Sequence, residues 1–126
     1  MLTVCLCGST RFKRIFELCI KELTSRGITV LYPDYYDNFD NNRIFTEDEI
    51  KNLEKIHFNK IKLSDTILII NPFDYIGEAT KKEISYATEL GKQILYFNDD
   101  KIFENYMIDS INRLFNNTTK CDWKRG

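Results

Sequence analysis

The chain has 126 residues, of which 43% are hydrophobic and 29% charged, and its formal net charge is −1. This length predicts a single domain over residues 1–126, and the near-zero charge argues against a nucleic-acid polymer as partner, which requires a basic excess. No apolar run reaches the roughly 18 residues of a membrane span. The N-terminal residues also lack the basic flank of a signal peptide, so we expect a cytoplasmic protein that does not bind membranes.

Four short apolar runs of residues that favour strands predict strands at Leu2–Cys7, Ile28–Tyr32, Thr66–Ile70 and Gln93–Phe97. The runs are continuous rather than alternating, which is typical of strands buried on both faces. Amphipathic patterns between and after them predict helices at about Thr10–Ser25, Thr46–Leu63, Ile76–Gly91 and Ile102–Phe115, followed by a polar tail at residues 116–126. This alternation predicts an α/β fold with a small doubly wound parallel sheet, flavodoxin-like or Rossmann-like, in three α/β/α layers.

Two helix ends carry clear local signals. Arg26 and Gly27 follow the first helical pattern and predict its end. Thr46, with Glu49 three residues later, predicts a capping box at the start of the second helix.

The four cysteines, Cys5, Cys7, Cys19 and Cys121, show neither disulfide spacing nor zinc-site spacing. Cys5 and Cys7 share one face of a predicted strand, and we interpret them as reduced core residues in a reducing compartment. We therefore expect no metal ion and no cofactor.

In open parallel sheets, ligands bind beyond the carboxyl ends of the strands. In this chain those ends are followed by polar or aromatic segments, which are Gly8–Arg11, Pro33–Asp37, Asn71–Tyr75 and Asn98–Asp100. We therefore expect the functional residues to lie along this one edge of the sheet.

The segment Gly8-Ser9-Thr10-Arg11 joins the first strand to the first helix. Glycine allows a tight turn, the two hydroxyl residues offer donors at a helix N-terminus, and Arg11 adds a fixed positive charge. This combination suits a phosphate group. The alternative is an ordinary helix cap followed by a surface arginine.

A long polar and aromatic loop runs from Asp34 to Phe45 and includes Tyr35. Loops of this length are often lids or binding loops, and aromatic residues can stack on a base or a sugar. The alternative is an insertion without function. We retain Asp34 and Tyr35 as candidate substrate-binding residues.

Glu83 occupies an unusual place in the third helical pattern. Ile76, Ala79 or Thr80, Ala87 and Leu90 form the inward stripe, and Glu83 lies on that stripe. A buried unpaired carboxylate is unfavourable. Glu83 is therefore either paired to a cation or facing a cavity that uses it. Asn71, Asp74, Gly77 and Thr80 flank it along the chain, and Asp74 has an alternative role as a helix N-cap.

His57 is the only histidine and lies one turn after Leu53 and one turn before Ile61, so it also faces inward. It is either a core histidine with satisfied hydrogen bonds or a catalytic residue. It reaches the strand-end edge only if the N-terminal half of its helix extends beyond the sheet.

The chain resembles the nucleoside 2-deoxyribosyltransferase family, which includes nucleoside 5′-monophosphate N-glycosidases. The resemblance covers about Val4 to Tyr96. It rests on the first-strand motif Cys7-Gly8-Ser9-Thr10-Arg11-Phe12, on the third strand Ser64–Ile70, and on Gly77 followed by Thr80, Glu83 and Ala87. In the family, the glutamate of this last helix is the nucleophile, and that position matches Glu83.

The resemblance implies a retaining double displacement at C1′ of a (deoxy)ribosyl group, with a covalent glycosyl–Glu83 intermediate that water or a second base resolves. It also implies an acid that assists departure of the base, for which Asp74 and His57 are candidates. The family often carries an aspartate where this chain has His57, and its Glu-x-Gly-x-Ala stretch reads Glu83-Ile84-Ser85-Tyr86-Ala87 here.

The Gly-Ser-x-Arg pattern resembles the monophosphate N-glycosidases, whose first loop binds the 5′-phosphate. The resemblance therefore implies a nucleoside 5′-monophosphate as substrate and water as acceptor. It also implies a homodimer or larger homo-oligomer, for which the helix 103–115 and Tyr86 are candidate contacts.

Three other hypotheses stay open. The chain transfers deoxyribose between the bases of unphosphorylated nucleosides, or it senses nucleotides without cleaving them, or it hydrolyses a dinucleotide. The residues indicate neither the base nor a preference for ribose or deoxyribose.

Overall fold

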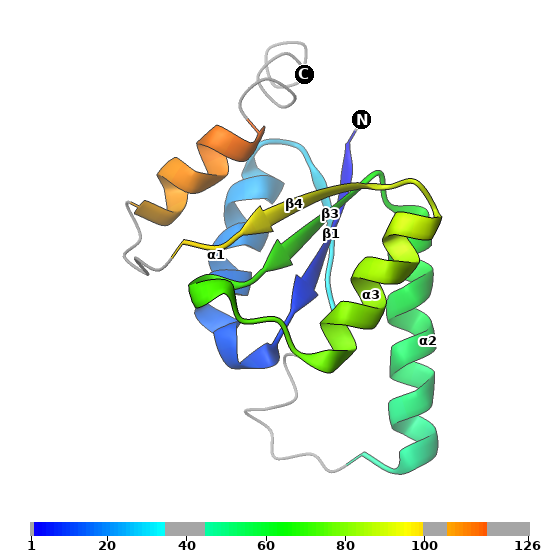
Figure 1. Cartoon of the computed structure of the whole chain (residues 1–126). Coiled ribbons are helices and arrows are strands. Elements are labelled where there is room, and N and C mark those ends of the chain that lie inside the picture. Colours follow the sequence, from blue (N-terminus) through cyan, green and yellow to red (C-terminus); the bar gives the residue numbers. More distant parts are fainter. Residues whose placement is uncertain (1, 35–44, 100–105, 116–126) are drawn as a thin grey trace.

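The computed structural model describes residues 2–34, 45–99 and 106–115 of the chain (Figure 1). Strands and helices alternate along it, in the order β1 (Thr3–Gly8), α1 (Lys13–Ser25), β2 (Thr29–Leu31), α2 (Glu47–Leu63), β3 (Thr66–Ile70), α3 (Glu78–Glu89) and β4 (Gln93–Phe97). Short 3-10 turns follow β1 and β3, at Thr10–Phe12 and Pro72–Asp74. Residues 106–115 are helical.

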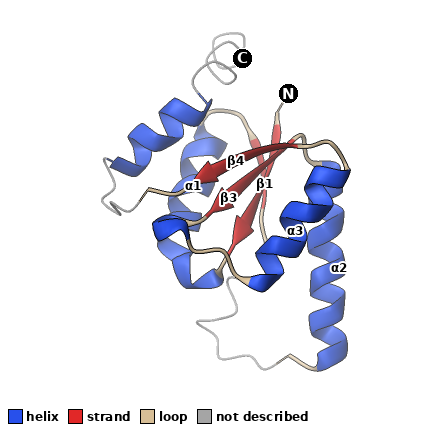
Figure 2. Ribbon diagram, in the orientation of Figure 1, coloured by secondary structure: helices blue, strands red, loops and turns tan. Residues whose placement is uncertain are grey.

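The four strands form one parallel sheet in the order β2-β1-β3-β4 (Figure 2). The chain moves outward from β1 to β2, then crosses back over β1 to β3. The carboxyl ends of β1 and β3 therefore flank the point where the winding direction reverses, and such switch points are where doubly wound sheets bind ligands. The predicted fold class is confirmed.

The sheet separates two hydrophobic layers. Alternate residues of the central strands point to opposite faces: Val4 and Leu6 join one cluster, whereas Cys5 and Cys7 join the other. The first cluster includes residues of α1 and of the helix at 106–115, and the second includes residues of α2 and α3. Figure 1 shows the same division, with these helices on opposite faces of the sheet.

Only the two central strands are buried on both faces. In β3 every residue is buried, and in β1 the residues Val4–Cys7 are buried. The prediction of full burial is wrong for β2 and β4, whose residues are mostly half-buried or exposed. Both are edge strands with a single strand neighbour, so less of their surface is covered.

The helix ends confirm the local signals and correct some boundaries. Thr46 and Glu49 form the reciprocal capping box of α2. Gly27 adopts φ 79° just after α1, as expected for a helix stop. The third helix is shorter than predicted, since it begins after its N-cap residue Gly77 and ends at Glu89. Ala79 and Leu90 are exposed, and the buried stripe of α3 is Thr80, Glu83 and Ala87.

Gly8 ends β1 at the carboxyl edge of the sheet, and its conformation requires a glycine. Its φ of 151° is rarely adopted by residues with a side chain, and a Cβ atom there would lie 2.6 Å from the backbone oxygen of Ile70. Gly8 pairs with Ile70 in the sheet. The close approach of β1 and β3 at the switch point therefore depends on this glycine.

Within the described residues, no helix is both long enough and apolar enough to cross a membrane.

Candidate active site

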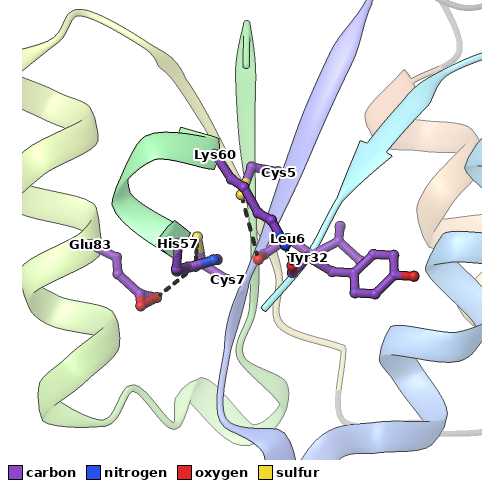
Figure 3. A network of polar contacts seen from close by, with 7 residues as sticks. All are labelled: Cys5, Leu6, Cys7, Tyr32, His57, Lys60 and Glu83. Carbon is purple, nitrogen blue, oxygen red and sulfur yellow. Dashed lines mark hydrogen bonds and ion pairs between the residues drawn. The ribbon is translucent and has the colours of Figure 1, made fainter. Parts of the chain in front are cut away.

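The buried carboxylate of Glu83 meets the only histidine of the chain. Glu83 is 5% exposed and His57 is 2% exposed. The Oε1 atom of Glu83 lies 3.4 Å from Nε2 of His57, and the same nitrogen lies 3.4 Å from Sγ of Cys7 (Figure 3). The partner of Glu83 within the described residues is therefore the imidazole of His57.

Three different elements supply these side chains. Cys7 is the penultimate residue of β1, His57 comes from the middle of α2, and Glu83 comes from the middle of α3. Figure 3 shows Glu83 and His57 pointing toward each other over the sheet. His57 therefore reaches the carboxyl end of β1 from α2, at the switch point of the sheet.

An aromatic contact sets the spacing of α2 and α3. The rings of Phe58 and Tyr86 pack edge to face with their centroids 5.0 Å apart, a geometry that stabilises aromatic pairs. Phe58 adjoins His57 in the sequence, and Tyr86 lies almost one turn after Glu83. The contact holds the two helices at the separation that brings His57 and Glu83 together. Tyr86 therefore packs against a residue of its own chain, and its role as a candidate subunit contact stays a prediction.

Burial shapes the chemistry of Cys7. Removal from water raises the pKa of its thiol well above the ordinary value, and the hydrogen bond and charge of Cys5 and the charge of Glu83 act in the same direction. Cys7 is therefore a neutral thiol beside the carboxylate at physiological pH. It was not among the predicted site residues, although its place at the carboxyl end of a central strand was a usable signal.

The residues of the Gly8–Arg11 loop, which are predicted to bind phosphate, lie at the same edge of the sheet. Ser9 is the N-cap of the 3-10 turn, and its Oγ accepts a hydrogen bond of 3.3 Å from the backbone N–H of Arg11. The Arg11 guanidinium lies over the ring of Tyr75, 4.3 Å from the ring centroid. Since Tyr75 follows β3, this cation–π contact joins the loops after β1 and β3. Tyr75 was not among the predicted site residues, and its contact with Arg11 makes it a further candidate.

The loop after β3 is strained. Phe73 and Asp74 both have positive φ values, 58° and 59°, and each such residue is unfavourable by roughly 1–3 kcal/mol. Phe73 is 63% exposed on this loop. Asp74 is exposed and its Oδ1 accepts from Nδ2 of Asn98 at 3.4 Å. The alternative role of Asp74 as cap of the third helix is wrong, because Gly77 occupies the N-cap of α3.

The other predicted site residues have identifiable neighbours. The buried side chain of Asn71, placed with its amide nitrogen toward the backbone, donates to the carbonyls of Ile69 and Phe97 and so links β3 to β4. Asp34 forms an ion pair of 2.7 Å with Lys60 of α2.

Thr80 is buried one turn before Glu83 on α3, and Thr10 lies in the 3-10 turn after Ser9. Tyr35 lies outside the described residues. Substrate contacts by all of these residues stay predictions.

The structure also forms a cluster that the sequence spacing did not indicate. Single ligand atoms of Cys5, Cys7 and His57 all lie within 4.8 Å of one another, and all three residues are buried. His57 is far from the two cysteines in the sequence, so no spacing rule could have joined them. Among the described residues, Cys5, Cys7 and Cys19 form no disulfide, and Cys121 lies outside those residues.

No protein-family model and no curated protein matches the chain. Among solved structures, it is similar to a 2-deoxyribosyltransferase from Bacillus psychrosaccharolyticus, with 19% identity, a TM-score of 0.60, and coverage of 86% of this chain and 81% of that one. It is also similar to the CMP N-glycosidase BcmB of Clostridium botulinum, with 18% identity, a TM-score of 0.56, and coverage of 85% and 96%. The chain therefore has the α/β fold that a deoxyribosyltransferase and a nucleotide N-glycosidase share.

Proposed function

We propose that the protein cleaves the N-glycosidic bond of a (deoxy)nucleoside 5′-monophosphate, with Glu83 as nucleophile and water as acceptor. The observation that carries the proposal is the buried Glu83 carboxylate, which contacts His57 at the switch point of the sheet. The similar fold of two enzymes that act on nucleosides and nucleotides supports the same chemistry. The Gly8–Arg11 loop at this edge of the sheet supplies the expected phosphate site.

In the first step, an oxygen of Glu83 attacks C1′ of the sugar and the bond between C1′ and the base nitrogen breaks. The base leaves with the electron pair of that bond and accepts a proton from an acid. The products are free base and a glycosyl ester of Glu83. His57 is the nearest candidate acid because its Nε2 lies 3.4 Å from the carboxylate. The exposed Asp74 is the second candidate.

In the second step, water attacks C1′ from the face that the base left, and the ester bond to Glu83 breaks. Two inversions at C1′ give retention of configuration. His57, having given up its proton to the base, would remove one from water. Replacing water by a second base in this step gives the deoxyribosyltransferase reaction, which is the alternative function.

The preference for a 5′-monophosphate rests on the loop after β1. Ser9, Thr10 and Arg11 come at the start of a helical segment at the carboxyl edge, where backbone N–H groups and a guanidinium favour an anion. Arg11 is also positioned by the Tyr75 ring. A substrate without a phosphate would leave this positive charge unused.

The test is a panel of ribo- and deoxynucleoside 5′-monophosphates and the matching nucleosides, with free base measured by chromatography. Each substrate is incubated with and without a second base as acceptor. We expect base release from monophosphates that does not require the second base. Release only in the presence of that base would favour the transferase, and release from nucleosides at equal efficiency would contradict a phosphate site.

Two glutamine variants on one helix separate catalysis from folding. Glu83→Gln is expected to abolish turnover, because an amide does not form the glycosyl ester, while the protein stays folded. Glu89→Gln is the matched control, since Glu89 is exposed near the end of the same helix. Mass spectrometry of quenched wild-type reactions is expected to show the sugar on the peptide containing Glu83. Unchanged turnover in Glu83→Gln would refute the mechanism.

Nucleotide-dependent thermal stabilisation without any base release would instead support the binding-module alternative. Nicotinamide release from NAD would support the dinucleotide alternative. We also retain the expectation of a homo-oligomer, to be checked by light scattering. The helix at 106–115 buries Met107, Ile111 and Phe115 in the core of its own chain.

A further inference from the structure

Hydrogen bonding does not satisfy both ring nitrogens of His57 in the cluster of Cys5, Cys7 and His57. Nε2 of His57 faces both Sγ of Cys7 and Oε1 of Glu83, each at 3.4 Å. A neutral imidazole nitrogen carries at most one proton, so it cannot serve both contacts well. On the other side of the ring, Nδ1 is buried and has no hydrogen-bond partner among the described residues. His57 is therefore not an ordinary core histidine with both nitrogens satisfied.

We propose that Cys5, Cys7 and His57 bind a thiophilic metal ion, with zinc as the best-fitting occupant and Glu83 next to the fourth coordination position. Two thiolates and an imidazole are a donor set that selects zinc or copper(I). The two sulfur atoms come from one face of β1, because residues two apart on a strand point the same way. The site needs no residue outside the described parts of the chain.

The separation of the Cys7 and His57 ligand atoms agrees with a tetrahedral ion. Zinc binds sulfur at about 2.3 Å and imidazole nitrogen at about 2.0–2.1 Å, which separates the two donors by about 3.6 Å. Sγ of Cys7 and Nε2 of His57 are 3.4 Å apart. Oε1 of Glu83 lies 3.4 Å from the same nitrogen. Glu83 is outside the group whose ligand atoms all lie within 4.8 Å of one another, so it lies beside the ion and is not counted as a ligand.

Charge and burial favour the same occupant. Two thiolates and a neutral imidazole around a divalent ion give no net charge, whereas copper(I) would leave one net negative charge in this buried site. Metal binding would release the two thiol protons, so affinity should increase with pH. Since all three ligands are buried, the ion enters through local opening of the α2 and α3 layer, and loading requires long incubation.

The test is titration of the metal-free, reduced protein with Co²⁺, a spectroscopic substitute for zinc. We expect one ion per chain and the thiolate-to-cobalt charge-transfer band together with the intense visible bands of tetrahedral cobalt. Zinc should displace the cobalt and remove these bands. X-ray absorption of the zinc form should show sulfur scatterers at about 2.3 Å.

Cysteine variants supply the control. Cys5→Ala and Cys7→Ala are each expected to weaken Co²⁺ binding at least about tenfold and to reduce the charge-transfer band. Cys19→Ala is the matched control, because Cys19 is equally buried but packs in the opposite hydrophobic layer. Circular dichroism verifies that each variant is folded. If the Cys5 and Cys7 variants do not fold, the X-ray absorption spectrum of the wild-type zinc form tests the proposal instead.

Absence of thiolate bands in the wild type, or their persistence in both β1 variants, would overturn the proposal. The metal site does not depend on the proposed glycosidase activity, because the spectra report the ligands without substrate. If both hold, zinc should inhibit base release, since it would engage His57 and Glu83. If the metal-free protein releases no base, the glycosidase proposal is refuted and the metal-site proposal is unaffected.

Discussion

Replacing Gly8 by alanine tests the geometry of the switch point directly. Gly8 has φ 151°, and an added Cβ would lie 2.6 Å from the Ile70 oxygen and 3.0 Å from the Ile70 Cβ. The substitution therefore adds backbone strain of roughly 1–3 kcal/mol. It also adds overpacking, which typically destabilises by about 1–3 kcal/mol. We expect Gly8→Ala to lower the free energy of unfolding by about 2–6 kcal/mol in total.

Gly27→Ala is the matched control for this prediction. Gly27 also has a positive φ, 79°, but a Cβ added there would have nothing within 4 Å. This variant reports the backbone strain alone, and the difference between the two variants reports the contact with β3. We expect that difference to be about 1–3 kcal/mol.

The assay is equilibrium unfolding in urea, followed by circular dichroism. With a slope of about 2 kcal/mol per molar urea, the midpoint of Gly8→Ala should fall roughly 1 M below that of Gly27→Ala. Equal midpoints for the two variants would refute the reasoning, because they would show that β1 and β3 separate at Gly8 without loss of stability. Gly8→Ala should also weaken monophosphate binding where it remains folded, since Gly8 leads directly into Ser9 and Arg11.

Three further predictions use other parts of the molecule. Burial raises the pKa of the Cys19 thiol from 9.0 to about 12; the folded state therefore resists ionisation, and its stability, intact below pH 9, should fall as pH rises toward 12. In urea unfolding between pH 9 and pH 12, the free energy of unfolding of the wild type should fall by about 1.4 kcal/mol per pH unit more than that of Cys19→Ala. Equal slopes in the two proteins would contradict the pKa shift. Arg11→Ala should raise KM for a monophosphate at least tenfold, roughly 1.4 kcal/mol, and leave KM for the corresponding nucleoside unchanged. Thr46→Ala should lower the free energy of unfolding by about 1 kcal/mol through loss of the α2 capping box, with no change in base release.

Local patterns were sufficient for the elements and for the most important site residue. A helix repeats every 3.6 residues and a strand every two, so side-chain direction along one element follows from the sequence alone. This is why Glu83 could be placed on the buried stripe of its helix and why the capping box at Thr46 was recognisable. The strand-end rule selects the Gly8–Arg11 loop for a similar reason, since it needs only the end of one apolar run and the polar residues that follow it.

Contacts between elements required the tertiary structure. The pairing of His57 with Glu83 depends on how α2 packs beside α3, and the contact of His57 with Cys7 depends on the position of β1 at the centre of the sheet. The contact of Arg11 with Tyr75 depends on β1 and β3 being neighbours. The two residues of each contact are far apart in the sequence and follow no periodic spacing. No sequence pattern could therefore have shown these contacts.

Short-range periodicity and local turn chemistry were enough to predict the α/β alternation, the buried position of Glu83 and the polar edge of the sheet. The contact of Glu83 with an imidazole, and the cluster that this imidazole forms with two cysteines of β1, could be seen only in the folded chain. Strand order and helix packing are set by burial over the whole chain. Residues distant in the sequence become neighbours only when the two hydrophobic layers close over the sheet.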